Sequence, residues 1–260
     1  MKITLLLVLS FCLNIFPQTE KEFQDWKSFY TNHNVTGCMI IYDLNRNEYQ
    51  VYNRERCNES FSPASTFKIL NSLIALETGV IKDENEVILW DSVKRSYDKW
   101  NMDQTLRTAI KYSAVWAYQE LARRIGEQRM NHYVDSVKYG NCNISGGIDQ
   151  FWLDGSLKIT PFEQIEFLKR LYSDNLPFSK RNLDIVKDIM INDQTDNYIL
   201  RGKTGWGINS KADVGWYVGY LEENHDVYFF VNNIDIVKDE DSRARIEIVK
   251  DIFRGRGLMK

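Results

Sequence analysis

Apolar residues cluster in short runs near both ends of the chain and recur at helical spacing in the middle. The runs are rich in β-branched and aromatic side chains and are bounded by turn-forming residues, which is typical of β-strands. A polar segment at 44–47 joins the first two runs as a hairpin turn. The sequence therefore predicts strands over residues 36–43, 48–54, 197–205, 213–223 and 226–236.

The helical signals lie mainly in residues 81–195, where apolar positions recur three and four residues apart between irregular segments. Further helices are expected over residues 21–31, 63–79 and 241–254. We therefore predict a mixed α/β fold whose antiparallel sheet is built from both chain ends and is flanked by helices. In this prediction, residues 19–260 form one domain with an inserted all-helical subdomain at roughly 81–195.

The first 18 residues have the pattern of a secretory signal peptide. One lysine precedes a mostly apolar stretch that ends in a polar segment. A membrane-spanning helix needs about 20 apolar residues, so this stretch is short for an anchor. We expect cleavage near Gln18 and export to the periplasm or the medium, with no stable membrane insertion afterwards. An uncleaved anchor is the alternative.

Composition narrows the functional classes. The 260 residues include 33 Lys and Arg against 36 Asp and Glu, a net charge of −3, whereas an electrostatic binder of nucleic acid shows a basic excess. Three histidines, and four cysteines without C-x-x-C spacing, make a metal site unexpected. Cys12 leaves with the signal peptide, and Cys38 and Cys57 either pair or stay buried as free thiols, like Cys142. The sequence does not specify an oligomeric state.

Ser65 and Lys68 form an S-x-x-K motif at the start of a predicted helix. Residues i and i+3 share a helix face, so the serine hydroxyl and the lysine amine can meet as nucleophile and adjacent base. The positive end of the helix dipole also lies at Ser65. The motif alone is weak evidence, because it arises by chance about once in such a chain, and Ser96 to Lys99 is a second match.

Four further motifs strengthen this interpretation. Lys203-Thr204-Gly205, at a predicted strand end, combines a cation, a hydroxyl and a glycine that admits a ligand to the backbone, which suits a carboxylate-bearing substrate. The others are Ser113-Ala114-Val115, Tyr139-Gly140-Asn141 and Phe151-Trp152-Leu153. Each alone has a purely structural explanation: a helix-face serine, a glycine turn or packed aromatic rings. Their joint occurrence, in this order after a signal peptide, favours one active site.

With PASTFK, SAV, YGN, FWL and KTGWG, followed by GWYVGYLE, the chain resembles the class D (oxacillinase-type) serine β-lactamases over nearly its whole mature length. Penicillin-binding transpeptidases and class A β-lactamases share S-x-x-K and K-T-G, but both usually carry Asn where this chain has Val115. Class A also needs a Glu-x-x-x-Asn loop, which does not occur at the corresponding place. The resemblance implies hydrolysis of β-lactam antibiotics through an acyl-enzyme on Ser65, and antibiotic resistance.

The resemblance further implies that N-carboxylated Lys68 is the general base for acylation and deacylation. Apolar surroundings from Phe67, Val115 and Trp152 would lower the pKa of Lys68, because desolvation disfavours its charge, and a neutral amine can react with carbon dioxide. Carbon dioxide or bicarbonate is then needed, but no other cofactor. The indole N–H of Trp152 would bind the carbamate, and Ser113 would relay a proton to the leaving nitrogen.

Backbone N–H groups of Ser65 and Trp206 are expected to form the oxyanion hole. The family also places an arginine near the start of the last helix to clamp the substrate carboxylate; Arg245 fits best by spacing, and Arg243 is the alternative. The expected substrate contacts are Val115, Lys203, Thr204, Gly205, Arg245 and Tyr97.

Aromatic residues around the expected cleft depart from the family pattern. Trp116 stands where many members have Pro, and it either packs in the core or alters the wall beside Lys68. Tyr97, Trp206 and Ile208 are expected to form an apolar lid. The short segment from Trp206 to Val214 resembles that of carbapenem-hydrolysing members.

Three other functions use related features. A β-lactam sensor domain has the same serine and lysine but keeps the acyl group, and such domains normally end a long membrane protein. A D-Ala-D-Ala peptidase acts on cell-wall peptide. A structural protein retains the fold without catalysis, and the intact motifs argue against that function.

Overall fold

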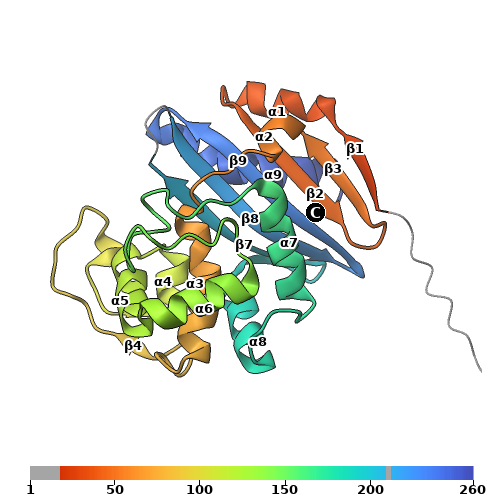
Figure 1. The fold of residues 1–260 in the computed structure, drawn as a ribbon. Coiled ribbons are helices and arrows are strands. Elements are labelled where there is room, and N and C mark those ends of the chain that lie inside the picture. Colours follow the sequence, from red (N-terminus) through yellow and green to blue (C-terminus); the bar gives the residue numbers. More distant parts are fainter. Residues whose placement is uncertain (1–17, 209–211, 260) are drawn as a thin grey trace, which may run out of the picture.

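A computed structural model describes residues 18–208 and 212–259 (Figure 1). Its centre is a seven-stranded sheet in the spatial order β1-β3-β2-β9-β8-β7-β6, antiparallel except that β1 runs parallel to β3. The strands are β1 (Thr19–Glu22), β2 (Gly37–Asp43), β3 (Glu48–Tyr52), β6 (Ile191–Gln194), β7 (Tyr198–Gly207), β8 (Asp213–Glu223) and β9 (Asp226–Ile236). The predicted antiparallel sheet built from both chain ends is confirmed.

The two edge strands lie outside the predicted set. Segment 21–31 was expected to be helical, yet β1 occupies Thr19–Glu22, and the α-helix α1 covers only Lys27–Asn32 after a 3-10 turn at Gln24–Trp26. All residues of β1 are polar and exposed. Pairing of its backbone with β3 makes this segment a strand, so no side-chain pattern signals it. The short, half-exposed β6 is likewise defined by its backbone pairing, in this case with β7, and not by a side-chain pattern.

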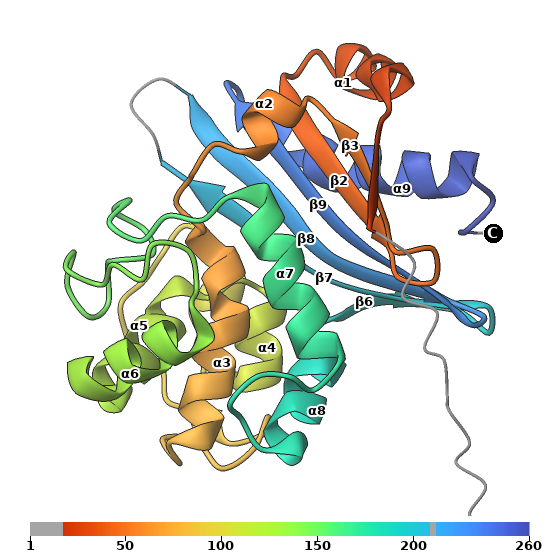
Figure 2. The same cartoon turned by 45° about the vertical axis from the view of Figure 1, so that its right-hand side comes forward.

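Helices cover both faces of the sheet (Figures 1 and 2). Helices α1 and α9 (Ala244–Gly255) lie on one face, and a thicker helical layer lies on the other. The remaining helices are α2 (Arg54–Cys57), α3 (Lys68–Glu77), α4 (Leu106–Lys111), α5 (Val115–Ile125), α6 (Glu127–Val137), α7 (Pro161–Tyr172) and α8 (Lys180–Ile189), with a small hairpin of β4 (Val87–Ile88) and β5 (Gln104–Thr105).

Strand β2 shows how the sheet separates two cores. Cys38 and Ile40 pack into the thicker helical layer, whereas Met39 and Ile41 pack with α1 and α9. Every position of β2 is buried because both faces are covered. This burial explains why the strand has a nearly continuous apolar sequence rather than an alternating one.

Helix α3 crosses the centre of the thicker layer and begins one turn later than expected. Its residues from Lys68 to Leu76 are all buried. Ser65 itself lies on a 3-10 turn, Ala64–Phe67, that leads into the helix. Ala64 has a positive φ of 48°, a conformation that is costly for a residue with a side chain. The helix is therefore preceded by a tight turn that presents the nucleophile candidate.

The predicted signal peptide lies outside the described residues except for Gln18. No helix within residues 18–208 and 212–259 has both the length and the apolar character that crossing a bilayer requires. Cys38, Cys57 and Cys142 are free thiols in the structure, the first two fully buried.

Candidate active site

The side chains of Ser65 and Lys68 meet as the motif predicts. The Lys68 Nζ donates a hydrogen bond of 2.8 Å to the Ser65 Oγ. Lys68 is fully buried, and desolvation lowers the pKa of its amine from 10.5 to about 7. A lysine with this pKa is substantially neutral near pH 7, so it can accept a proton from the adjacent hydroxyl.

Aromatic rings pack on the turn that leads into Lys68, and one ring lies close to its amine. Phe67 stacks on Trp152 with ring centroids 5.5 Å apart, and both rings are fully buried. The ring of Tyr118 lies 5.2 Å from the Lys68 Nζ. The Tyr118 hydroxyl is held 2.8 Å from the Ser72 Oγ, which donates to the Lys68 carbonyl. The sequence singled out neither residue: Ser72 lies one turn along α3 from Lys68, whereas only the packing of α5 against α3 brings Tyr118 to the lysine.

Trp152 presents a buried donor without a partner. Its indole N–H makes no hydrogen bond within the described part of the chain. Its carbonyl accepts from the Ala64 N–H (3.0 Å) and the Ser62 hydroxyl (2.8 Å), so the residue is tied to the turn that carries Ser65. Leaving a buried N–H unpaired costs about 1–3 kcal/mol of stability. The unpaired indole therefore indicates that a bound or covalently attached group supplies an acceptor at this position.

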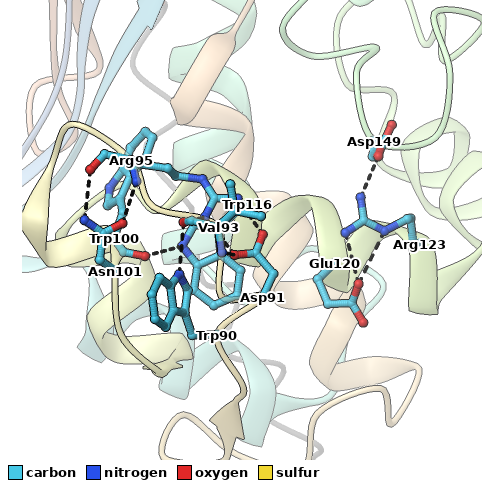
Figure 3. Close-up of polar contacts among 10 residues, drawn as sticks. All are labelled: Trp90, Asp91, Val93, Arg95, Trp100, Asn101, Trp116, Glu120, Arg123 and Asp149. Carbon is cyan, nitrogen blue, oxygen red and sulfur yellow. Dashed lines mark hydrogen bonds and ion pairs between the residues drawn. The ribbon is translucent and has the colours of Figure 1, made fainter.

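The Tyr139-Gly140-Asn141 motif closes the loop that carries Trp152. The Asn141 N–H donates to the Lys158 carbonyl, and the Asn141 side-chain oxygen accepts from the Lys158 N–H, both at 2.9 Å. Gly140 has a positive φ of 55°, and a Cβ at this position would lie 2.0 Å from the Lys158 oxygen. Asp149 belongs to the same loop and accepts a hydrogen bond from Arg123 of α5, which also binds Glu120 (Figure 3). The Tyr139-Gly140-Asn141 motif therefore helps to position Trp152 without contacting it in any described hydrogen bond.

Ser113 and Lys203 also come together. Ser113 lies between α4 and α5 with a positive φ of 53°, rather than on a helix face, and its Oγ accepts a hydrogen bond from the Lys203 Nζ. The Lys203 amine also donates to the Thr204 carbonyl at 2.9 Å. Burial holds the pKa of Lys203 well below its usual range, and the nearby positive charges of Lys68 and Arg245 lower it further. An anion beside Lys203 would relieve this repulsion.

Strand β7 passes directly along the Ser65 turn. A Cβ on Gly205 would lie 3.1 Å from the Pro63 oxygen, and one on Gly207 would lie 3.5 Å from the Ala64 Cβ. Strand β6 pairs only with residues 199–201 of β7, so the K-T-G part of β7 is a sheet edge. The Trp206 backbone, between these two glycines, therefore runs beside Ser65, where the oxyanion hole is expected.

Arg245 reaches the site and Arg243 does not. The Arg245 Nη1 donates to the Gly205 carbonyl at 2.6 Å, and its guanidinium lies 5.7 Å from the centre of the Trp206 ring. Burial lowers the pKa of Arg245 to about 10. Arg243 is exposed on the preceding 3-10 turn. The expected arginine is therefore Arg245.

Trp116 anchors a loop at the rim of the site (Figure 3). It is buried, its indole N–H donates to the Trp100 carbonyl at 2.9 Å, and the Arg95 guanidinium lies 5.6 Å from its ring. The Trp100 indole donates in turn to the carbonyl of Tyr112, the residue before Ser113, at 2.9 Å. Trp116 therefore packs in the core, as one of the two expectations for it stated.

The remaining predicted residues lie nearer the surface. Tyr97 is 48% exposed and packs edge-on against Trp100, and Trp206 is 37% exposed. Ile208 is 85% exposed. No described contact joins the three, so the apolar lid stays a prediction. Val115 begins α5 half-buried, without a described contact to Lys68.

Comparison with known proteins gives concordant results. Residues 29–254 match the family model of the penicillin-binding protein transpeptidase domain. The chain is 42% identical to β-lactamase OXA-48 of Klebsiella pneumoniae over 92% of its own length and 91% of the relative's. A class D β-lactamase structure from Nostoc superposes with a TM-score of 0.88 at 48% identity, covering 90% and 99% of the two chains. The C-terminal domain of the Bacillus licheniformis BlaR penicillin receptor reaches 0.89 at 34% identity, covering 94% and 100%.

Proposed function

This chain belongs to the class D serine β-lactamases, hydrolases of the β-lactam amide, and from that premise we propose that it opens its substrate through an acyl-enzyme on Ser65 with Lys68 as the general base. The observation that carries this proposal is the buried hydrogen bond from Lys68 to Ser65, together with the unpaired indole N–H of Trp152, whose ring stacks on Phe67. Export to the periplasm and antibiotic resistance are part of the same proposal.

Acylation begins with transfer of the Ser65 hydroxyl proton to the Lys68 side chain. The Ser65 oxygen then attacks the β-lactam carbonyl, and the backbone N–H groups of Ser65 and Trp206 stabilise the resulting oxyanion. The carbon–nitrogen bond of the ring breaks. Ser113, whose Oγ accepts a hydrogen bond from the Lys203 Nζ, relays the proton held by Lys68 to the leaving nitrogen, which returns Lys68 to its basic form.

The residues around Lys68 fit an N-carboxylated lysine. The lowered pKa leaves a substantial fraction of the amine neutral, and so nucleophilic toward carbon dioxide, near pH 7, and the unpaired Trp152 N–H would be a donor for the carbamate. When present, the carbamate supplies an anionic oxygen as the proton acceptor in place of the amine nitrogen. The Lys68 side chain then takes a proton from the water that attacks the acyl-enzyme ester, and Ser65 leaves with its proton restored.

Two cations without described carboxylate partners, the buried Lys203 and the half-buried Arg245, provide the substrate-carboxylate site. The described hydrogen bonds of Lys203 and Arg245 go only to hydroxyl and carbonyl oxygens. The acidic net charge of the chain does not attract an anionic β-lactam. The attraction must therefore come from these local cations and from the Thr204 hydroxyl.

A β-lactam sensor is the second candidate, favoured by the similarity to the penicillin receptor domain. Mixing purified protein with a chromogenic cephalosporin separates the two functions. We expect many turnovers per protein molecule. A single stoichiometric burst would instead indicate a sensor or a transpeptidase.

Replacing Trp152 with Phe tests the role of the indole N–H, because the ring remains to stack on Phe67. We expect Trp152→Phe to lose at least about 10-fold in kcat, since one hydrogen bond to a charged group contributes about 1.5–3 kcal/mol. Added bicarbonate should restore part of the activity.

Trp90→Phe is the matched control, because the Trp90 indole donates to the Val93 carbonyl away from Lys68. Normal kcat in Trp152→Phe, indifferent to bicarbonate, would contradict the carboxylated-lysine mechanism.

A further inference from the structure

A cavity of 620 Å³ opens on the far side of Lys203 and Thr204 from the nucleophile. It lies between α4, α8, the β6–β7 edge and the start of α9, and neither Ser65 nor Lys68 lines it. Its lining outside the catalytic motifs includes Arg107, Lys111, Asp188, Asn192, Ile246 and Lys250. The volume is that of a typical small-molecule subsite.

The charges on this lining are unequally compensated. Arg107 pairs with Asp188 at 2.7 Å and with Glu84 at 3.3 Å, and Lys250 pairs with an aspartate of β6 at 3.0 Å. Lys111 has no carboxylate partner among the described ion pairs; its ammonium lies 5.8 Å from the ring of its neighbour Tyr112. Lys203, at the other border of the cavity, is likewise uncompensated. Two cations without counter-charges therefore face one cavity.

We propose that this cavity binds a second anionic group of the substrate, carried on the substituent next to the ring carboxylate, with Lys111 as its contact. The inference rests on the proposed function. When the ring carboxylate is held by Lys203, Thr204 and Arg245, an adjacent substituent would enter the cavity past Thr204, because Thr204 lines the cavity and its Oγ also lies 3.4 Å from the Lys203 Nζ. The preferred substrates are accordingly dianionic β-lactams.

Two cephalosporins with the same acyl side chain test this preference, one with an uncharged 3-substituent and one whose 3-substituent ends in a carboxylate. The readout is the ratio of their kcat/KM values, anionic over neutral. Reversing the charge in Lys111→Glu should lower this ratio about 10-fold, the effect of exchanging attraction for repulsion at a partly exposed pair. Lys111→Arg should keep the ratio near that of the wild type.

Lys27→Glu provides the matched control, because Lys27 is an exposed lysine on α1. Thermal unfolding of each variant verifies that it is folded. An unchanged ratio in Lys111→Glu overturns the inference, while turnover of the neutral cephalosporin continues to support the proposed function. Failure of the wild type to hydrolyse either compound overturns both.

Discussion

At the scale of single residues, the site concentrates groups that are unfavourable for folding. Lys68 and Lys203 are buried, Arg245 is half-buried, and desolvation lowers the pKa of each. None has a carboxylate partner in the described contacts. A buried charge without a counter-charge destabilises a fold, so the same features that prepare the site for an anionic substrate cost stability.

Replacing Lys68 with Met should therefore stabilise the protein in bicarbonate-free buffer. The folded-state pKa of about 7 lies below the ordinary 10.5, so the unfolded chain binds the extra proton between these values. The destabilisation by Lys68 is thus fully present below about pH 7 and disappears as the pH rises toward 10.5. We expect Lys68→Met to raise the free energy of unfolding by about 4 kcal/mol at low pH and little at high pH.

Urea denaturation near pH 6 and near pH 10 measures both values. Lys27→Met, at an exposed lysine, should show no such pH dependence. An equal gain for Lys68→Met at both pH values would contradict the argument.

At the scale of elements, segments distant from the chemistry determine where its groups lie. The Gly140 turn and Asn141 close the loop before α7, and that loop places Trp152 against Phe67 and the Ser65 turn. Gly205 and Gly207 let β7 approach the same turn closely. The glycines of these motifs therefore act through backbone proximity, which a Cβ would prevent.

Gly140→Ala should be more harmful than an otherwise similar substitution at Gly79. Both positions have positive φ, 55° and 67°, but a Cβ at Gly79 would have no atom within 4 Å, whereas one at Gly140 would overlap the Lys158 carbonyl. We expect Gly79→Ala to cost about 1 kcal/mol and Gly140→Ala more than about 2 kcal/mol.

Chemical denaturation measures the two costs. Trp152 fluorescence in a background with the other tryptophans replaced reports on the loop. Equal costs at the two glycines would mean that the loop accommodates the side chain without strain.

At the scale of the whole molecule, the two chain ends meet behind the site. The Tyr30 hydroxyl of α1 donates to the Asn232 side chain on β9 at 2.7 Å, and the Asn232 amide donates to the Arg245 carbonyl at 2.9 Å. Asn232 is fully buried. This connection joins residues about 200 positions apart and fixes the start of α9, from which Arg245 reaches β7.

Breaking this connection at Asn232 should weaken substrate binding. Asn232→Leu leaves both the Tyr30 hydroxyl and the Arg245 carbonyl without their partner, so we expect about 1–3 kcal/mol lower stability and a several-fold higher KM. Tyr30→Phe removes only the distal hydroxyl and should lower stability while leaving KM unchanged. Steady-state kinetics and urea denaturation measure both effects. A normal KM in Asn232→Leu would show that Arg245 is positioned without this contact.

Local sequence signals were sufficient for most of the fold. Strands β2, β7, β8 and β9 follow from side-chain pattern, because both faces of the central sheet are buried and demand apolar residues. Strand β1 could not be predicted in this way, because only backbone hydrogen bonds to β3 define it. The order of strands is likewise a property of long-range pairing rather than of any one segment.

The sequence by itself determined which residues are the candidates for the chemistry: Ser65 with Lys68 one turn later, and the K-T-G tripeptide. Short-range spacing is enough to encode a nucleophile beside its base. Only the tertiary structure decided what those residues experience. The pKa of Lys68 near 7 and the unpaired Trp152 N–H arise from burial among segments far apart in the sequence, as do the choice of Arg245 over Arg243 and the cation-lined cavity beyond Lys203. Desolvation and charge proximity depend on what surrounds a group in space, and no local sequence pattern contains that information.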